Sequence, residues 1–147
     1  MIPAFRAATT NTGRALEIVR MVLMFLVFGG MLGYALELYV IGHWLPTFQS
    51  QIPFYVTIPG VVFIAWIFFD RTTPWVRIAF IVTMLVLIVT GILGAYYHWL
   101  WNMMDAGEID WNFTPAMENF HGFRPILAAL AYTNMGVTGL ACIYRAR

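Results

Sequence analysis

Four long runs of apolar residues, almost free of charge, leave this chain few choices of fold. A helix needs about 20 residues to cross the hydrocarbon core of a bilayer, and a membrane β-strand would alternate apolar and polar residues. These runs are apolar on every side, and a backbone in lipid must satisfy its own polar groups, so helices are expected. We predict an all-α protein with transmembrane helices over about residues 21–43, 53–69, 75–101 and 124–144.

Two local signals refine the boundaries of these helices. The second run is the shortest and contains Pro59-Gly60 near its start, so we expect a kink there or a start as early as Ile52. Thr73 and Pro74 precede the third run, as an N-cap and a first helical residue would. We expect residues 1–20 to form an interfacial or loosely ordered segment and residues 21–147 a single transmembrane domain.

The composition agrees with a membrane protein and excludes several other classes. Of the 147 residues, 61% are hydrophobic and 10% are charged, whereas a soluble domain carries about 25% charged residues. A net charge of +1 argues against a nucleic-acid partner, which requires a concentrated basic surface. The single cysteine, Cys142, excludes an intrachain disulfide, and we expect it to pack as a small apolar residue. The first apolar run is as long as a full span, so no cleavable signal peptide is expected.

The arginines predict how the chain is oriented. All the basic residues are arginines, and all but one fall on the side of the predicted helices that carries both termini: Arg6, Arg14, Arg20, Arg71, Arg77, Arg145 and Arg147. Loops rich in basic residues stay in the cytoplasm. We therefore predict an antiparallel, up-down four-helix bundle in a bacterial inner membrane, with both termini in the cytoplasm.

The histidines and most carboxylates fall on the opposite, outer side. His43 ends the first predicted helix, His98 lies near the end of the third, and His121 precedes the fourth. Glu118 and His121 form a Glu-x-x-His pair, whose side chains share one face of a helix and can share a metal. The candidate metal ligands are Glu37, His98, Glu118 and His121, and the candidate cofactor ligands, for a haem or chlorin ring, are His98, His121 and His43. The cofactor itself stays unknown.

Glycine stripes lead to two of these candidates. Gly29, Gly33 and Glu37 share one face of the first helix, and Gly91, Gly94 and His98 share one face of the third. Small residues at such spacings allow a second helix to approach closely, so we expect both stripes to face neighbouring helices. If they face each other, Glu37 and His98 come within reach; alternatively, Glu37 is interfacial and reaches water.

Arg124 is the one arginine expected on the outer side. In a loop with four carboxylates, it is predicted to form an ion pair with an acidic residue or to contact a lipid phosphate. The stretch Gly91–His98, followed by an outer loop and by Pro125 at the start of the last helix, resembles small bacterial membrane proteins of unassigned role and implies no function.

The sequence favours a structural role over a catalytic one. It has no Gly-rich phosphate loop and no pair of cysteines for thiol chemistry. We predict a small non-catalytic subunit of a larger electron-transfer, photosynthetic or oxidase complex, in contact with lipid and with other membrane subunits or copies of itself. The alternatives are a redox, metal-binding or haem-binding membrane protein with an outer His/Glu site, and a small transporter or lipid-binding protein.

Overall fold

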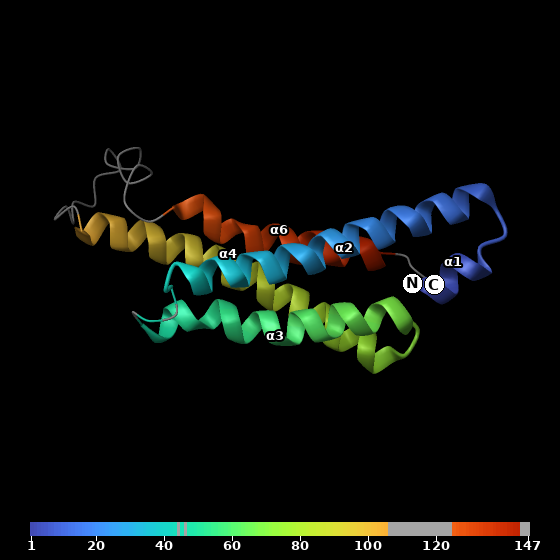
Figure 1. The fold of residues 1–147 in the computed structure, drawn as a ribbon, viewed down its shortest axis with the longest axis horizontal. Helices are drawn as coiled ribbons and strands as arrows, with labels where there is room; N and C mark the ends of the chain where they lie inside the picture. Colours follow the sequence, from blue (N-terminus) through green and yellow to red (C-terminus); the bar gives the residue numbers. More distant parts are fainter. Residues whose placement is uncertain (44, 46, 106–124, 145–147) are drawn as a thin grey trace.

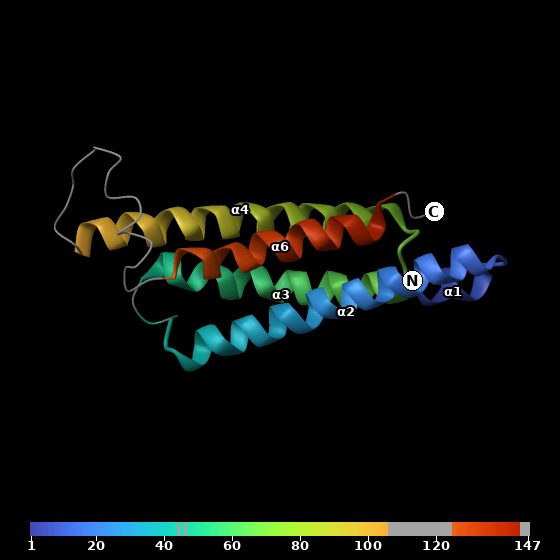
Figure 2. The ribbon, with the colours of Figure 1, turned by 90° about the horizontal axis from the view of Figure 1, so that it is seen from above.

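The computed structural model describes residues 1–43, 45, 47–105 and 125–144, and every element in them is helical. A short helix, α1 (Ile2–Ala7), precedes four long ones: α2 (Asn11–Val40), α3 (Phe48–Phe69), α4 (Pro74–Asp105) and α6 (Ile126–Ile143). Figures 1 and 2 show the long helices side by side along the long axis, with the N-terminus and the end of α6 toward the same end. Each of the four is long and apolar enough to cross a membrane, as predicted.

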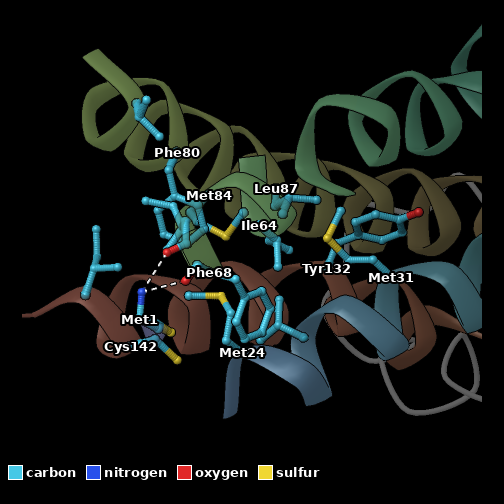
Figure 3. Packing of buried hydrophobic residues seen from close by; sticks show 14 of the residues in the cluster. Met1, Met24, Met31, Ile64, Phe68, Phe80, Met84, Leu87, Tyr132 and Cys142 are labelled. Atoms are coloured by element: carbon cyan, nitrogen blue, oxygen red, sulfur yellow. Dashed lines mark hydrogen bonds between the residues drawn. The ribbon is translucent and has the colours of Figure 1, made fainter. Parts of the chain in front are cut away.

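Within the described residues, each long helix packs against two others. α2 and α4 both contact α3 and α6, whereas α2 and α4 are not neighbours. Between them lies a core of interlocking aliphatic, aromatic and thioether side chains, among them the fully buried Met24, Met31, Ile64, Met84 and Leu87 (Figure 3). Methionine is flexible enough to fill gaps between helices. The thiol of Cys142 is buried in this core, as expected.

Glycines bring α4 and α6 into close contact. A Cβ atom on Gly136 of α6 would lie 2.5 Å from the carbonyl oxygen of Met84, and one on Gly91 of α4 would lie 2.5 Å from the backbone nitrogen of Thr133. Real Cβ atoms do not approach that closely, so only glycine allows the two backbones to pack this way. The predicted packing role of the Gly91 stripe is therefore confirmed, and its neighbour is α6.

The glycine stripe on α2 behaves differently from the prediction. No described atom of another helix lies within 4 Å of where a Cβ would be on Gly29 or Gly33. Within the described residues, the prediction that this stripe faces a neighbouring helix is wrong. Because it does not face the α4 stripe either, the condition under which Glu37 and His98 would come within reach is not met. α2 instead turns its larger apolar residues, such as Met24 and Met31, toward the core, because they bury more apolar area than glycine does.

The first three long helices begin before their predicted starts, whereas α6 begins at Ile126, slightly after its own. α2 starts at Asn11, since the Thr10 hydroxyl oxygen accepts from the backbone nitrogen of Gly13 at 3.1 Å and caps the first turn. A reciprocal capping box between Thr47 and Ser50 starts α3, so the second helix does begin before Ile52. Pro74 is the first residue of α4, as predicted.

Candidate functional site

A cleft opens between the helices at the end remote from the N-terminus. Its volume is about 150 Å³, and residues from the end of α2, the start of α3, the second half of α4 and the start of α6 line it. Six of the lining residues carry aromatic rings: Tyr34, His43, Tyr97, His98, Trp101 and Tyr132. The exposed residues Gln49 and Leu93 also line it, so the cleft reaches the molecular surface.

Two histidines meet at the cleft. The ring centroids of His43 and His98 lie 5.9 Å apart, edge to face at 63°. Nδ1 of His98 lies 3.1 Å from the carbonyl oxygen of Pro125. Because a carbonyl can only accept, Nδ1 carries a hydrogen, and in the neutral ring Nε2 then keeps a lone pair, which is the arrangement used to orient histidine ligands. Burial, followed by the neighbouring His98, lowers the pKa of His43 and favours its neutral form.

Three hydroxyl groups are anchored on backbone carbonyls, and two of them, those of Tyr34 and Tyr132, belong to residues that line the cleft. The Tyr34 hydroxyl donates to the carbonyl of Ala128 at 2.7 Å, and the Thr57 hydroxyl donates to that of Pro53 at 2.7 Å. The Tyr132 hydroxyl lies 2.8 Å from Oγ1 of Thr57 and 3.3 Å from the same Pro53 carbonyl. The Tyr34 and Tyr132 rings meet edge to face, with their centroids 5.1 Å apart. These contacts fix both rings and tie α2 and α3 to α6.

The structure brings together only part of the predicted site. His43 and His98 meet, whereas Glu37 is exposed and does not line the cleft. Glu118, His121 and Arg124 lie outside the described residues, so the four-residue metal site and the roles of Arg124 stay predictions. Within the described ranges, no group of three His, Cys, Asp or Glu residues could hold a metal ion.

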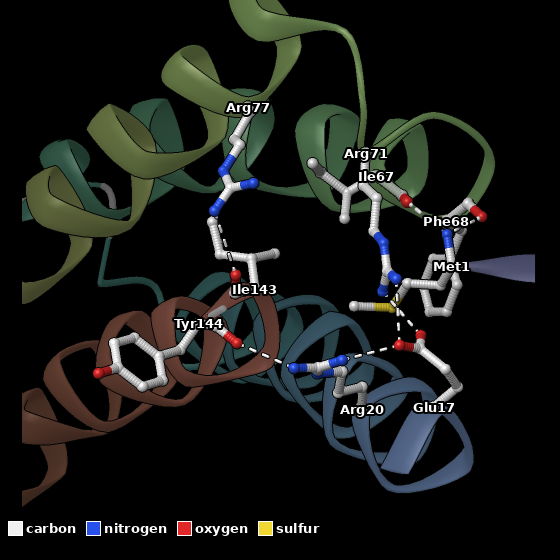
Figure 4. A network of polar contacts seen from close by, with 9 residues as sticks. All are labelled: Met1, Glu17, Arg20, Ile67, Phe68, Arg71, Arg77, Ile143 and Tyr144. Carbon is white, nitrogen blue, oxygen red and sulfur yellow. Dashed lines mark hydrogen bonds and ion pairs between the residues drawn. The ribbon is translucent and has the colours of Figure 1, made fainter. Parts of the chain in front are cut away.

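A second polar cluster, which the sequence did not predict, lies at the opposite end of the molecule (Figure 4). The carboxylate of Glu17 on α2 accepts from Arg71, in the loop between α3 and α4, at 2.7 and 3.0 Å, and from Arg20 at 2.7 Å. Arg20 also donates to the carbonyl of Tyr144 at 2.9 Å. We call these three buried side chains, Glu17, Arg20 and Arg71, the charged clamp, because they join the start of α2 to the α3–α4 loop and the end of α6.

Further contacts reinforce the clamp end. The N-terminal nitrogen of Met1 donates to the carbonyls of Ile67 and Phe68 at 3.1 and 2.8 Å, at the C-terminus of α3 (Figures 3 and 4). Arg77 donates to the carbonyl of Ile143 at 3.5 Å. The spacing of Glu17 and Arg20 by three residues was a visible signal of an ion pair, but nothing in the sequence pointed to Arg71 as its second partner.

Comparison with known proteins found no matching protein-family model, no matching curated protein and no matching solved structure.

Proposed function

We propose that this chain is a non-catalytic subunit of a larger membrane complex and that α2 carries the surface on which a partner helix packs. The observation that carries the proposal is the α2 glycine stripe, Gly29, Gly33 and Glu37, which faces outward with open space over both glycines in the described chain. In lipid, apolar surface alone does not drive helices together, and close packing over small residues does. An unfilled glycine stripe therefore supports the presence of a second helix from another subunit.

The exposed carboxylate of Glu37 narrows the choice of partner. A carboxylate that faces lipid on a membrane helix is costly unless it reaches water or finds a partner. If two copies of this chain met through the same stripe in parallel, the two Glu37 side chains would come together and repel each other. The proposed partner is therefore a different chain, whose transmembrane helix carries a basic or hydrogen-bond-donating side chain at the depth of Glu37.

The proposal includes an orientation: an antiparallel, up-down bundle in a bacterial inner membrane, with both termini in the cytoplasm. It is supported by the positions of Arg20, Arg71 and Arg77, which gather at the clamp end, and by His43 and His98, which lie at the other. Basic residues are retained on the cytoplasmic side of membrane proteins.

The partner is tested by purifying the protein gently from its native membrane and measuring its size on native gels. We expect wild type to migrate in a larger complex and Gly33→Ile to migrate alone, because the added side chain fills the space needed by the partner. Since that space is open within the chain, the variant should fold normally. Val89→Phe, at an exposed position of α4, is the control and should keep the complex. A wild-type protein that migrates as a lone chain, or a Gly33→Ile variant that keeps its partner, would contradict the proposal.

Orientation is tested separately with a membrane-impermeant maleimide on intact cells. The native Cys142 is buried and should stay unlabelled. Arg14 and Gln49 are both exposed and lie toward opposite ends of the molecule, so Arg14→Cys and Gln49→Cys serve as matched probes. We expect Gln49→Cys to be labelled and Arg14→Cys to be labelled only after the cells are opened. The reverse pattern would place the termini outside.

A further inference from the structure

We propose that the cleft binds a flat, uncharged aromatic ring that carries hydroxyl groups, that is, a phenol or the hydroquinone head of a lipid. This goes beyond the proposed role as a subunit, because it assigns a ligand to a surface that the partner helix does not use. The inference rests on the size of the cleft, on the rings that line it, and on the direction in which its hydrogen bonds are already committed.

The volume of the cleft and the residues that line it favour a ligand with a single ring. The cleft has a volume of about 150 Å³, which is too small to enclose a haem. An apolar protein cavity of roughly that volume holds one benzene molecule. Rings from α2, α4 and α6, including Tyr34, Tyr97 and Tyr132, surround the cleft. Aromatic groups stack or meet edge to face with one another, so these walls favour a planar aromatic ligand.

Two hydrogen bonds already made within the protein leave acceptor atoms in the cleft for a ligand that donates. The hydroxyl hydrogen of Tyr34 is directed to the carbonyl of Ala128, and Nδ1 of His98 donates to the carbonyl of Pro125. Both residues line the cleft, and what they still offer to it is acceptor atoms: the hydroxyl oxygen of Tyr34 and, in the neutral ring, Nε2 of His98. A ligand hydroxyl can donate to these two atoms, whereas an ether or carbonyl oxygen cannot.

The lack of a carboxylate among the described lining residues excludes a protonated amine as the donating ligand. No carboxylate is among the described residues that line the cleft, and Glu37 lies on another face of α2. A protonated amine would therefore leave water without a counter-ion, which is costly. A phenolic hydroxyl donates without carrying a charge. The exposed Leu93 on the lipid-facing side of α4 gives the cleft an opening through which a ring on a lipid tail can enter.

The test measures binding to the purified full chain in nanodiscs, using the fluorescence of the tryptophans, one of which, Trp101, lines the cleft. The probes are hydroquinone, its dimethyl ether, and a hydroquinone that bears a decyl chain. We expect the ether to bind at least about tenfold more weakly than hydroquinone, because it keeps the ring but loses both donors. Tighter binding of the decyl compound identifies a lipid as the source of the ligand, and equal binding identifies a free phenol; either supports the site.

Three variants test whether the ligand binds in the cleft. His98→Phe keeps a ring but removes the acceptor nitrogen, and it should reduce hydroquinone affinity about tenfold while leaving the ether unchanged. Leu93→Trp fills the opening from an exposed position, so it should fold and should block binding even if His98→Phe does not fold. Tyr96→Phe is the control, since Tyr96 is exposed on the same helix and does not line the cleft.

Three results would overturn the proposal. Equal affinity for hydroquinone and its ether would show that the acceptors play no part. Hydroquinone binding that survives Leu93→Trp would place the ligand elsewhere. Stoichiometric binding of Zn²⁺ that His98→Phe abolishes, in a protein that does not bind hydroquinone, would show that the two histidines serve a metal instead.

Discussion

Replacing Glu17 by glutamine should destabilise the protein more than any other single change of charge in its described residues. The charged clamp holds one carboxylate between two guanidinium groups, and all three residues are at most 9% exposed. The carboxylate accepts three hydrogen bonds of 2.7 to 3.0 Å from Arg20 and Arg71. Glutamine keeps the shape of the side chain but removes the charge and turns one acceptor into a donor.

The expected loss of stability follows from the two buried guanidinium groups that the substitution leaves without a carboxylate. Removing one partner of a buried ion pair costs about 3 to 5 kcal/mol, because the remaining charge has lost its compensation. Here two buried guanidinium groups remain beside each other, so we expect a loss of about 3 kcal/mol in the free energy of unfolding. For a chain of this size that corresponds to a fall of about 10 °C in the midpoint of thermal unfolding.

The protein carries its own reporter for this measurement. Cys142 is the sole cysteine and is fully buried, so a thiol-reactive dye that fluoresces on reaction follows unfolding in detergent. Glu37→Gln is the matched control, because it makes the same substitution on the exposed side of the same helix and should shift the midpoint by less than about 2 °C. A double-mutant cycle with Arg71→Gln should give a coupling energy of about 2 kcal/mol with Glu17. If Glu17→Gln unfolds at the same temperature as Glu37→Gln, the clamp does not hold the helices together.

Three further variants probe packing and pH. Gly136→Ala should lower stability by about 1 to 3 kcal/mol in the same dye assay, because its Cβ would meet the carbonyl of Met84. Gly29→Ala, over open space, should leave stability unchanged or raise it slightly. Hydrogen bonds from Thr73, then from Thr72, lower the pKa of Asp70 from 3.8 to about 2. Since the folded pKa is the lower one, Asp70 stabilises the fold above about pH 4, and this contribution is lost as the pH falls toward 2. Asp70→Asn should flatten that part of the profile of unfolding temperature against pH.

The sequence predicts the helices well because their signal is local. Length and uniform apolarity identify four possible spans without knowledge of their neighbours. The ends are harder to predict, because caps such as Thr10 and Thr47 lie in polar segments and extend a helix beyond its apolar run. The small helix α1 gives no apolar signal of its own, and its position depends on tertiary contacts such as that of Met1 with the end of α3.

The face that each helix turns to its neighbours is the hardest feature to predict. Two glycine stripes look alike in the sequence, yet Gly91 packs on α6 and Gly33 faces outward. In a chain that is apolar all round, the polar and apolar faces that would orient a helix are missing. The same difficulty affects the site. The chain positions of His43 and His98 placed them at one end, but the ring contact of Tyr34 with Tyr132 and the hydrogen bond of Tyr132 with Thr57 depend on which faces converge.

The two proposals use different faces of one helix, so they can fail independently. Successive residues of a helix point about 100° apart, which turns the side chain of Tyr34 into the cleft while Gly33 faces outward. Gly33→Ile should therefore release the partner and leave hydroquinone binding intact, and Leu93→Trp on α4 should do the reverse. If either variant abolished both complex formation and hydroquinone binding, the partner surface and the cleft would not be independent sites.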